Sequence, residues 1–222
     1  MEAAVAVGRP RSVARWAVLG GLLYVVLFVI GTIVLFNGEP SGDASPARVI
    51  QWYSDSGHRD RANIGWILFG LGVFFLLWFI GALRGAVSAV DGEGILTAVV
   101  AIGGTIYAAV AFAAVALNVG IRTMSDDTYQ HRVFPELIHA ADDAGYVMHA
   151  SGAAALGAMI IAASLAFMWG AVWPKWAGWL GVLVGILALA SIAFFPQFLF
   201  LLWILVVSLW MFLRPPAPGR PT

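Results

Sequence analysis

The segment 139–149 carries the side chains of this sequence that are best suited to chemistry. Two imidazoles, two carboxylates and one phenol follow one another at spacings of three, four and seven: His139, Asp142, Asp143, Tyr146 and His149. On a helix, such spacings place side chains along one stripe. Imidazole nitrogens and carboxylate oxygens bind divalent metals, and histidine also exchanges protons near neutral pH. One interpretation is therefore a metal site made of His139, Asp142, Asp143 and His149.

A helix cap is the competing interpretation of the same residues. Asp142 and Asp143 stand just before an apolar run, where carboxylates would cap a helix and complement its positive end. His139 would then be an exposed loop residue, and His149 would form a hydrogen bond with a neighbouring helix. The spacing matches no metal motif such as H-E-x-x-H. We therefore expect the cap, with no catalytic residue and no bound cofactor.

Long apolar segments must position these side chains. Of the 222 residues, 61% are hydrophobic and 11% are charged, which is far more apolar than an ordinary soluble domain. A helix needs about 20 apolar residues to cross a bilayer, and open strands would leave backbone groups unpaired in lipid. We predict an all-α integral membrane protein whose single domain, 1–222, is a bundle of six transmembrane helices. Their bounds are about 16–36, 64–83, 95–119, 145–172, 176–194 and 197–213, and the segments 1–12 and 215–222 form flexible cytoplasmic tails.

The basic residues predict how the bundle is oriented. With the N-terminus inside, the inner side holds seven of the 12 Lys and Arg residues: Arg9, Arg11, Arg15, Arg84, Lys175, Arg214 and Arg220. Most acidic residues fall in two outer loops, at about 38–62 and 120–144. An excess of basic residues on the inner side predicts that both termini are cytoplasmic. The membrane expected for this protein is the plasma membrane.

The first outer loop contains a short predicted helix. Ser45 followed by Pro46 is typical of a helix start, with serine as the N-cap and proline at the first helical position. The apolar side chains that follow include Trp52 and Tyr53. One interpretation is an interfacial helix with these rings among the lipid headgroups. The other is a helix that folds back as a cap over the outer mouth of the bundle.

Small residues predict where the helices pack. In 145–172, alanines recur at fourfold spacing: Ala150, Ala154, Ala158, Ala162 and Ala166. Small side chains let membrane helices approach closely, so this ridge and the Gly- and Ala-rich 95–119 are predicted near the middle of the bundle. The segment 197–213, which is rich in Phe and Trp, is predicted to face lipid.

Three functions are compatible with this pattern. We expect a non-catalytic multi-pass protein that acts through helix packing against lipid, a second copy or a membrane-protein partner. The first alternative is a small permease or channel-like module, which a polar cavity between the helices would favour. The second alternative is a metal-dependent membrane enzyme, which His58 or His131 close to the His139–His149 stripe would favour. There is no phosphate loop and no long basic cluster, so no nucleic-acid partner is expected.

The chain resembles a family of uncharacterised bacterial six-helix integral membrane proteins that share a domain of unknown function. The resemblance spans nearly the whole chain and is carried by SPARVIQWY at 45–53 with Arg59 to Arg61 after it, by Leu83-Arg84, by PKWAGWLG at 174–181, and by the stretch from Phe195-Pro196 to Leu213-Arg214. It implies the six-helix fold, the topology and a bacterial plasma membrane. It implies no activity and no catalytic residue.

Overall fold

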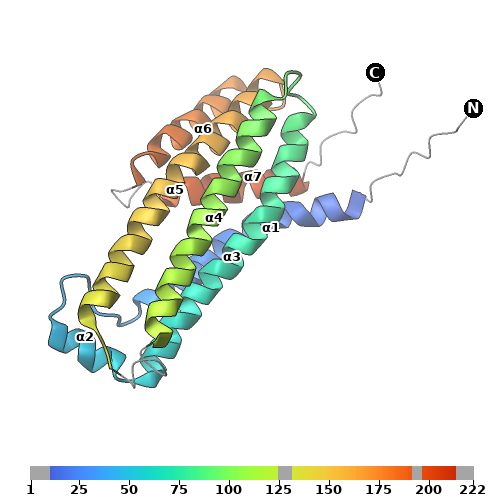
Figure 1. The fold of residues 1–222 in the computed structure, drawn as a ribbon. Coiled ribbons are helices and arrows are strands. Elements are labelled where there is room, and N and C mark those ends of the chain that lie inside the picture. Colours follow the sequence, from blue (N-terminus) through green and yellow to red (C-terminus); the bar gives the residue numbers. More distant parts are fainter. Residues whose placement is uncertain (1–10, 125–131, 192–196, 214–222) are drawn as a thin grey trace, which may run out of the picture.

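The computed structural model describes residues 11–124, 132–191 and 197–213, and every regular element in these ranges is a helix. Figure 1 shows long helices that lie side by side, with shorter ones at either end. In chain order the helices are α1 (Arg11–Phe36), α2 (Pro46–Tyr53), α3 (Ser56–Ser88), α4 (Ile95–Met124), α5 (Pro135–Trp169), α6 (Lys175–Ala188) and α7 (Gln197–Leu213).

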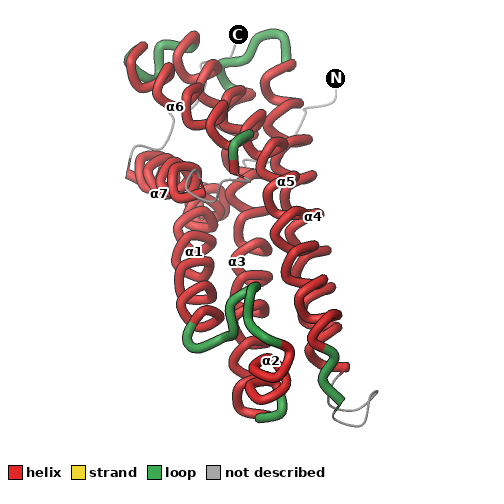
Figure 2. The backbone as a smooth tube through the Cα atoms, turned by 90° about the vertical axis from the view of Figure 1, so that its left-hand side faces the viewer, coloured by secondary structure: helices red, strands yellow, loops and turns green. Residues whose placement is uncertain are grey.

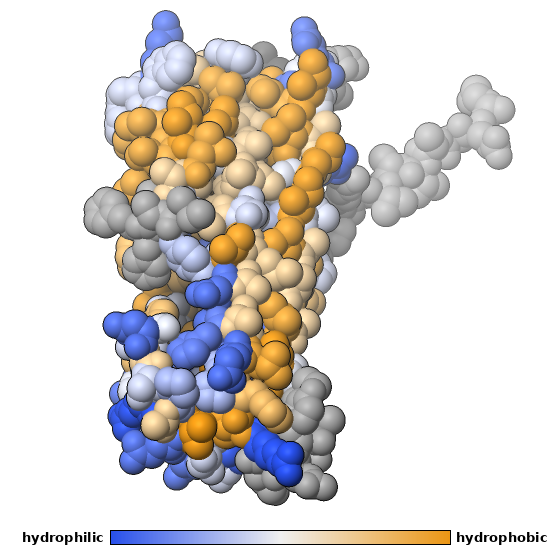
Figure 3. All heavy atoms as spheres, turned by 60° about the vertical axis from the view of Figure 1, so that its left-hand side comes forward, coloured by the Kyte–Doolittle hydropathy of each residue, from blue (hydrophilic) through white to orange (hydrophobic). Residues whose placement is uncertain are grey.

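Four helices of the described residues are long and apolar enough to cross a membrane. The qualifying stretches are Arg15–Phe36, Ser56–Ser88, Ile95–Thr123 and Pro135–Trp169, in α1, α3, α4 and α5. Helices of this length and composition are consistent with a helical membrane protein. Figure 3 agrees: hydrophilic residues gather at the end that carries α2, and hydrophobic side chains cover most of the visible face beyond it.

Close helix contacts hold these four helices together. A Cβ atom added to Gly31 of α1 would lie 2.8 Å from the carbonyl oxygen of Gly65 of α3. A Cβ atom added to Gly103 of α4 would lie 2.5 Å from the carbonyl oxygen of Ala155 of α5. Since real Cβ contacts are longer, only glycine fits at Gly31 and Gly103 without a shift of the backbone. Backbones this close maximise van der Waals contact, which is the main attraction between helices in lipid.

The predicted alanine ridge of α5 is only partly correct. Ala150, Ala162 and Ala166 are buried, but Ala154 and Ala158 are exposed. The packed stripe of α5 runs instead through residues such as Ala153 and Leu156, which are fully buried. A fourfold repeat drifts around the helix because one turn takes about 3.6 residues, so a long ridge cannot stay on one face.

Helix α7 does not lie with its bulky side chains in lipid, contrary to the prediction. Figures 1 and 2 both show α7 running across the long helices, where it packs mainly against α1. Phe200 and Trp203 are buried in the core, whereas Phe198 is 55% exposed. The hydroxyl of Ser208 fixes the crossing, because it donates to the carbonyl oxygen of Val18 at 2.6 Å and accepts from the Leu22 amide at 3.2 Å.

Helix α2 forms where the sequence predicts it. The Ser45 hydroxyl accepts a hydrogen bond from the Arg48 amide at 3.4 Å, and proline occupies the first turn. Val49, Trp52 and Tyr53 are almost fully buried, 1–4% exposed, so α2 lies against the ends of the long helices (Figure 2). Of the two interpretations of this segment, the cap over the bundle fits these contacts.

Candidate functional site

A cavity of about 530 Å³ lies between α1, α3, α5 and α7, beneath the segment that joins α1 to α2. Its wall is mostly aromatic and aliphatic, and the side chains of this kind that line it are Phe28, Leu35, Phe36, Trp66, Phe69, Phe198 and Leu201. α4 contributes Ala114. A volume of this size and an apolar wall with few polar groups are typical of small-molecule sites.

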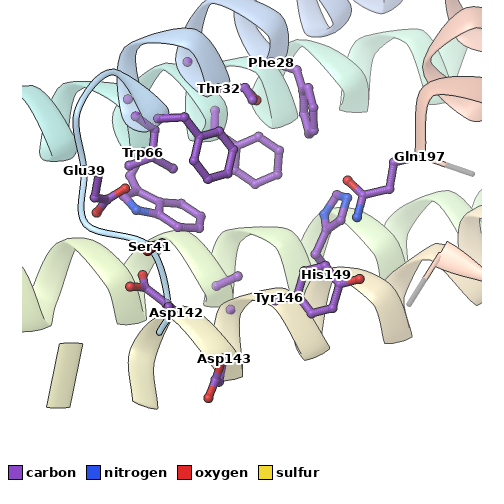
Figure 4. A pocket seen from close by; sticks show the side chains of 18 of the residues that line it. Phe28, Thr32, Glu39, Ser41, Trp66, Asp142, Asp143, Tyr146, His149 and Gln197 are labelled. Carbon is purple, nitrogen blue, oxygen red and sulfur yellow. The ribbon is translucent and has the colours of Figure 1, made fainter. Parts of the chain in front are cut away.

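The polar groups of the cavity are separated into two ends (Figure 4). The carboxylates of Glu39 and Asp142 lie at one end, close to the segment that leads to α2. The imidazole of His149 and the amide of Gln197 lie at the other end and point toward each other. Since Asp142 and His149 are seven residues apart on α5, the two ends are separated by roughly 10 Å along the helix.

Arg122 organises the end of the site near α2. Its side chain is fully buried, and it forms ion pairs through Nη2 with Oδ1 of Asp142 at 2.5 Å and Oε1 of Glu39 at 3.0 Å. Nη1 donates to Oδ1 of Asn118 at 2.6 Å, and Nε donates to the hydroxyl oxygen of Tyr53 at 3.1 Å. The Tyr53 hydroxyl in turn donates to Glu39. One guanidinium therefore connects α2, α4, α5 and the segment between α1 and α2.

Burial and charge act in opposite directions on Glu39. Its carboxylate is 9% exposed, and burial raises the pKa of Glu39 above its ordinary value because water no longer solvates the charge. The charge of Arg122 opposes that rise and does not cancel it. Burial likewise raises the pKa of Tyr53, so its hydroxyl keeps its proton and remains a donor to Glu39.

His149 lies in an aromatic cage at the other end. The rings of Phe28, Phe69, Tyr107 and Phe200 surround its imidazole at centroid distances of 5.5–6.0 Å. Nδ1 lies 3.4 Å from the Tyr107 hydroxyl, which is 2.6 Å from the Tyr24 hydroxyl. Nε2 is buried and has no hydrogen-bond partner among the described residues.

The structure separates the four residues of the predicted metal site. Asp142 pairs with Arg122, Asp143 lies exposed at the cavity wall, His149 is in the aromatic cage and His139 is half-buried. No group of three or more His, Cys, Asp or Glu side chains able to hold a metal forms within the described ranges. His58 stacks on Trp52 at 4.7 Å, and His131 lies outside the described residues.

The predicted helix cap is wrong for Asp142 and Asp143. Helix α5 begins at Pro135, and its N-cap, Phe134, makes no side-chain cap. The two carboxylates therefore lie two turns inside the helix, where no free backbone N–H groups remain. Their surroundings, not the helix end, determine their roles.

Arg122, Asn118, Glu39 and Tyr53 were missed as site residues by the sequence interpretation. The sequence predicts Arg122 in the outer loop at about 120–144, whereas it lies within α4. The available signal was the i, i+4 spacing of Asn118 and Arg122 after a long apolar run. That spacing places the two side chains on one face of the helix, but it does not identify Glu39 or Asp142 as partners of Arg122.

Comparison of the chain with models of protein families, with curated proteins and with solved structures finds no match. The resemblance to a bacterial six-helix family therefore stays a prediction. The function is inferred from the geometry of the cavity.

Proposed function

We propose that this protein binds a small, largely apolar molecule of the membrane phase in the cavity between α1, α3, α5 and α7. The observation that carries the proposal is the pairing of a mostly apolar, 530 Å³ cavity with a few polar groups held at its two ends. This combination solvates an apolar body and fixes its orientation. A small permease module needs a binding cavity of this kind, whereas a protein that acts only through helix packing does not.

Packing against a partner remains a second candidate function. It is supported by Ala154 and Ala158, which expose small side chains on the outer surface of α5. A second copy or another membrane protein could approach α5 closely there. A role as a metal-dependent enzyme has no comparable support within the described residues.

We further propose the plasma membrane of a bacterium as the location, with both termini cytoplasmic. The excess of basic residues on the predicted inner side supports this orientation. Helices α6 and α7, with 14 and 17 residues, are shorter than the four long ones. Four and six crossings are both even numbers, so either places the two termini on the same side.

Saturable binding of a probe hydrocarbon tests the proposed function. Fluorene, a rigid and wholly apolar molecule, is to be dialysed to equilibrium against the purified protein in detergent, with protein-free micelles as the blank. We expect one saturable site per chain. Thr32→Trp, which places a large ring in the cavity, should weaken binding by about tenfold or more because it removes the volume that the ligand needs.

Ile33→Trp is the matched control for this experiment. Ile33 is the next residue of α1, is 64% exposed and does not line the cavity. The same ring at this position should leave fluorene binding unchanged. If the wild-type protein takes up no more fluorene than the micelle blank, or if both variants bind equally well, the cavity is not a ligand site.

A further inference from the structure

The unpartnered nitrogen of His149 indicates which polar group a ligand would carry. His149 is 9% exposed, its Nε2 has no hydrogen-bond partner among the described residues, and the residue lines the cavity. Figure 4 shows its ring directed into the space between the helices, toward Gln197. A buried polar atom without a partner costs free energy, and a ligand that supplies the partner recovers it.

The hydrogen-bond chain that leads to His149 determines whether Nε2 donates or accepts. Tyr24 and Tyr107 are both fully buried, and within the described part of the chain the Tyr24 hydroxyl bonds only to that of Tyr107. If Tyr24 donates to Tyr107, and Tyr107 donates to Nδ1 of His149, both phenol hydrogens are used. The imidazole then carries its proton on Nε2, which is a donor. The reverse direction leaves the Tyr24 hydrogen and the Nε2 lone pair both unpaired, so it is disfavoured.

Trp66 supports the same conclusion from another wall of the cavity. It lines the cavity from α3, and its buried Nε1 also lacks a partner among the residues that the structure describes. An indole N–H can donate and cannot accept. Both unpartnered nitrogens of the cavity wall therefore favour a ligand that carries acceptor atoms.

The charges of the site favour a neutral ligand. Glu39, Asp142 and Asp143 line the cavity, whereas Arg122, which pairs with the first two, is not among its described lining residues. Three carboxyl groups face one guanidinium, so the site disfavours an anion. An ammonium group carries no free lone pair, so it cannot accept a hydrogen bond from Nε2–H of His149 or from the indole N–H of Trp66. A carbonyl oxygen accepts a hydrogen bond without adding charge.

We propose that the cavity takes a neutral, largely apolar molecule whose polar end is a carbonyl oxygen, which accepts a hydrogen bond from Nε2–H of His149. This inference rests on the proposed function, because it names the class of ligand for the same cavity. Phe28 and Phe69, which line the cavity beside the imidazole, hold the adjoining apolar part of the ligand. Tyr107 acts as a positioning residue, since its hydroxyl sets the position of the imidazole proton.

A pair of probes that differ only in the acceptor tests this proposal. Fluorene carries a CH₂ group where 9-fluorenone carries a carbonyl, and the two ring systems are otherwise of the same shape. We expect the wild-type protein to bind fluorenone about tenfold more tightly than fluorene after correction for partition into protein-free micelles, as one buried hydrogen bond allows. His149→Phe should bind both probes equally, because a phenyl ring preserves the shape and removes the donor.

Two further variants identify the group that recognises the carbonyl. Tyr107→Phe should reduce the preference for fluorenone, since the proton of His149 is then free to occupy Nδ1. His58→Phe is the matched control: His58 stacks on Trp52 at 4.7 Å and is not among the described residues that line the cavity, so the same substitution there should leave the preference unchanged. A preference that survives His149→Phe and disappears in Trp66→Phe would assign the donor to Trp66 and overturn the role of His149.

The infrared spectrum of bound fluorenone gives a readout that depends on no variant. Its carbonyl stretch should shift to lower frequency on binding to the wild-type protein, because a hydrogen bond weakens the C=O bond. Equal affinity for the two probes with an unshifted stretch would overturn the carbonyl proposal and leave the cavity a ligand site. If neither probe binds, the proposed function itself fails.

Discussion

Nη2 of Arg122 in α4 lies 2.5 Å from Oδ1 of Asp142 in α5. The arginine side chain is fully buried, whereas the aspartate side chain is 35% exposed. The pair therefore joins two long helices at the point where the protein interior meets the polar end that carries α2. Because Arg122 also holds Glu39, the same ion pair fixes the segment that closes one end of the cavity.

Arg122→Met should destabilise the fold strongly. The substitution keeps an unbranched apolar stem but removes the guanidinium, which leaves Glu39 and Asp142 without their cation. The loss of one partner of a buried ion pair costs about 3–5 kcal/mol. Thermal unfolding in detergent measures the effect. Arg48→Met is the control, since the Arg48 side chain is exposed and, among the described residues, donates to Gln51, so that loss should be below about 1 kcal/mol. Equal melting temperatures for the two variants would contradict a structural role for Arg122.

Glu39→Gln should change how stability depends on pH. Burial raises the pKa of Glu39 in the folded state. The contribution of this carboxyl group to folding stability is therefore fully present below its ordinary pKa of 4.5 and is lost as the pH rises through the raised pKa. The unfolding free energy of the wild type minus that of Glu39→Gln should therefore fall as pH increases above 4.5. Glutamine can still accept the hydrogen bonds of Tyr53 and Arg122, so the variant should fold.

Asp43→Asn is a control with the opposite sign. Asp43 is exposed, and a hydrogen bond from Ser41 lowers the pKa of its carboxyl group. Its contribution to folding stability is therefore present at pH values above its ordinary pKa of 3.8 and is lost as the pH falls through the lowered pKa of the folded state. Denaturant titrations of the three proteins over a series of pH values provide the comparison. A difference between wild type and Glu39→Gln that stays constant with pH would show that the carboxyl of Glu39 is not perturbed.

The sequence is sufficient to predict the helices and insufficient to predict the site. Continuous apolar runs identify α1, α3, α4 and α5, and Ser45-Pro46 identifies α2, because each depends on neighbouring residues. The first turns of α5 are missed because they are polar, and they are held by the ion pair of Asp142 with Arg122 and by the packing of Ile138 against α2. That ion pair joins positions 20 apart, and the pair of Arg122 with Glu39 joins positions 83 apart. Contacts of this kind leave no periodic pattern along the chain.

Two alanines of α5 test the corrected packing. Ala153 is fully buried in the core, whereas Ala158, in the middle of the predicted ridge, is exposed. Ala153→Leu should cost about 1–3 kcal/mol because the larger side chain overpacks the core around α5. Ala158→Leu should change the melting temperature little. The reverse order of effects would mean that the original ridge, and not the stripe through Ala153, faces the core.

Thiol labelling tests the proposed orientation, since the chain contains no cysteine of its own. Gly42 lies between α1 and α2, and Gly92 lies between α3 and α4; a Cβ atom added at either position would meet no atom within 4 Å. Single cysteines there should therefore leave the fold intact. In whole cells, a membrane-impermeant maleimide should label Gly42→Cys. It should reach Gly92→Cys only after the membrane is permeabilised, because the distribution of basic residues predicts that the segment between α3 and α4 lies inside. Labelling of Gly92→Cys in intact cells, with Gly42→Cys protected, would reverse the orientation and place α2 and the Arg122 ion pairs on the cytoplasmic side.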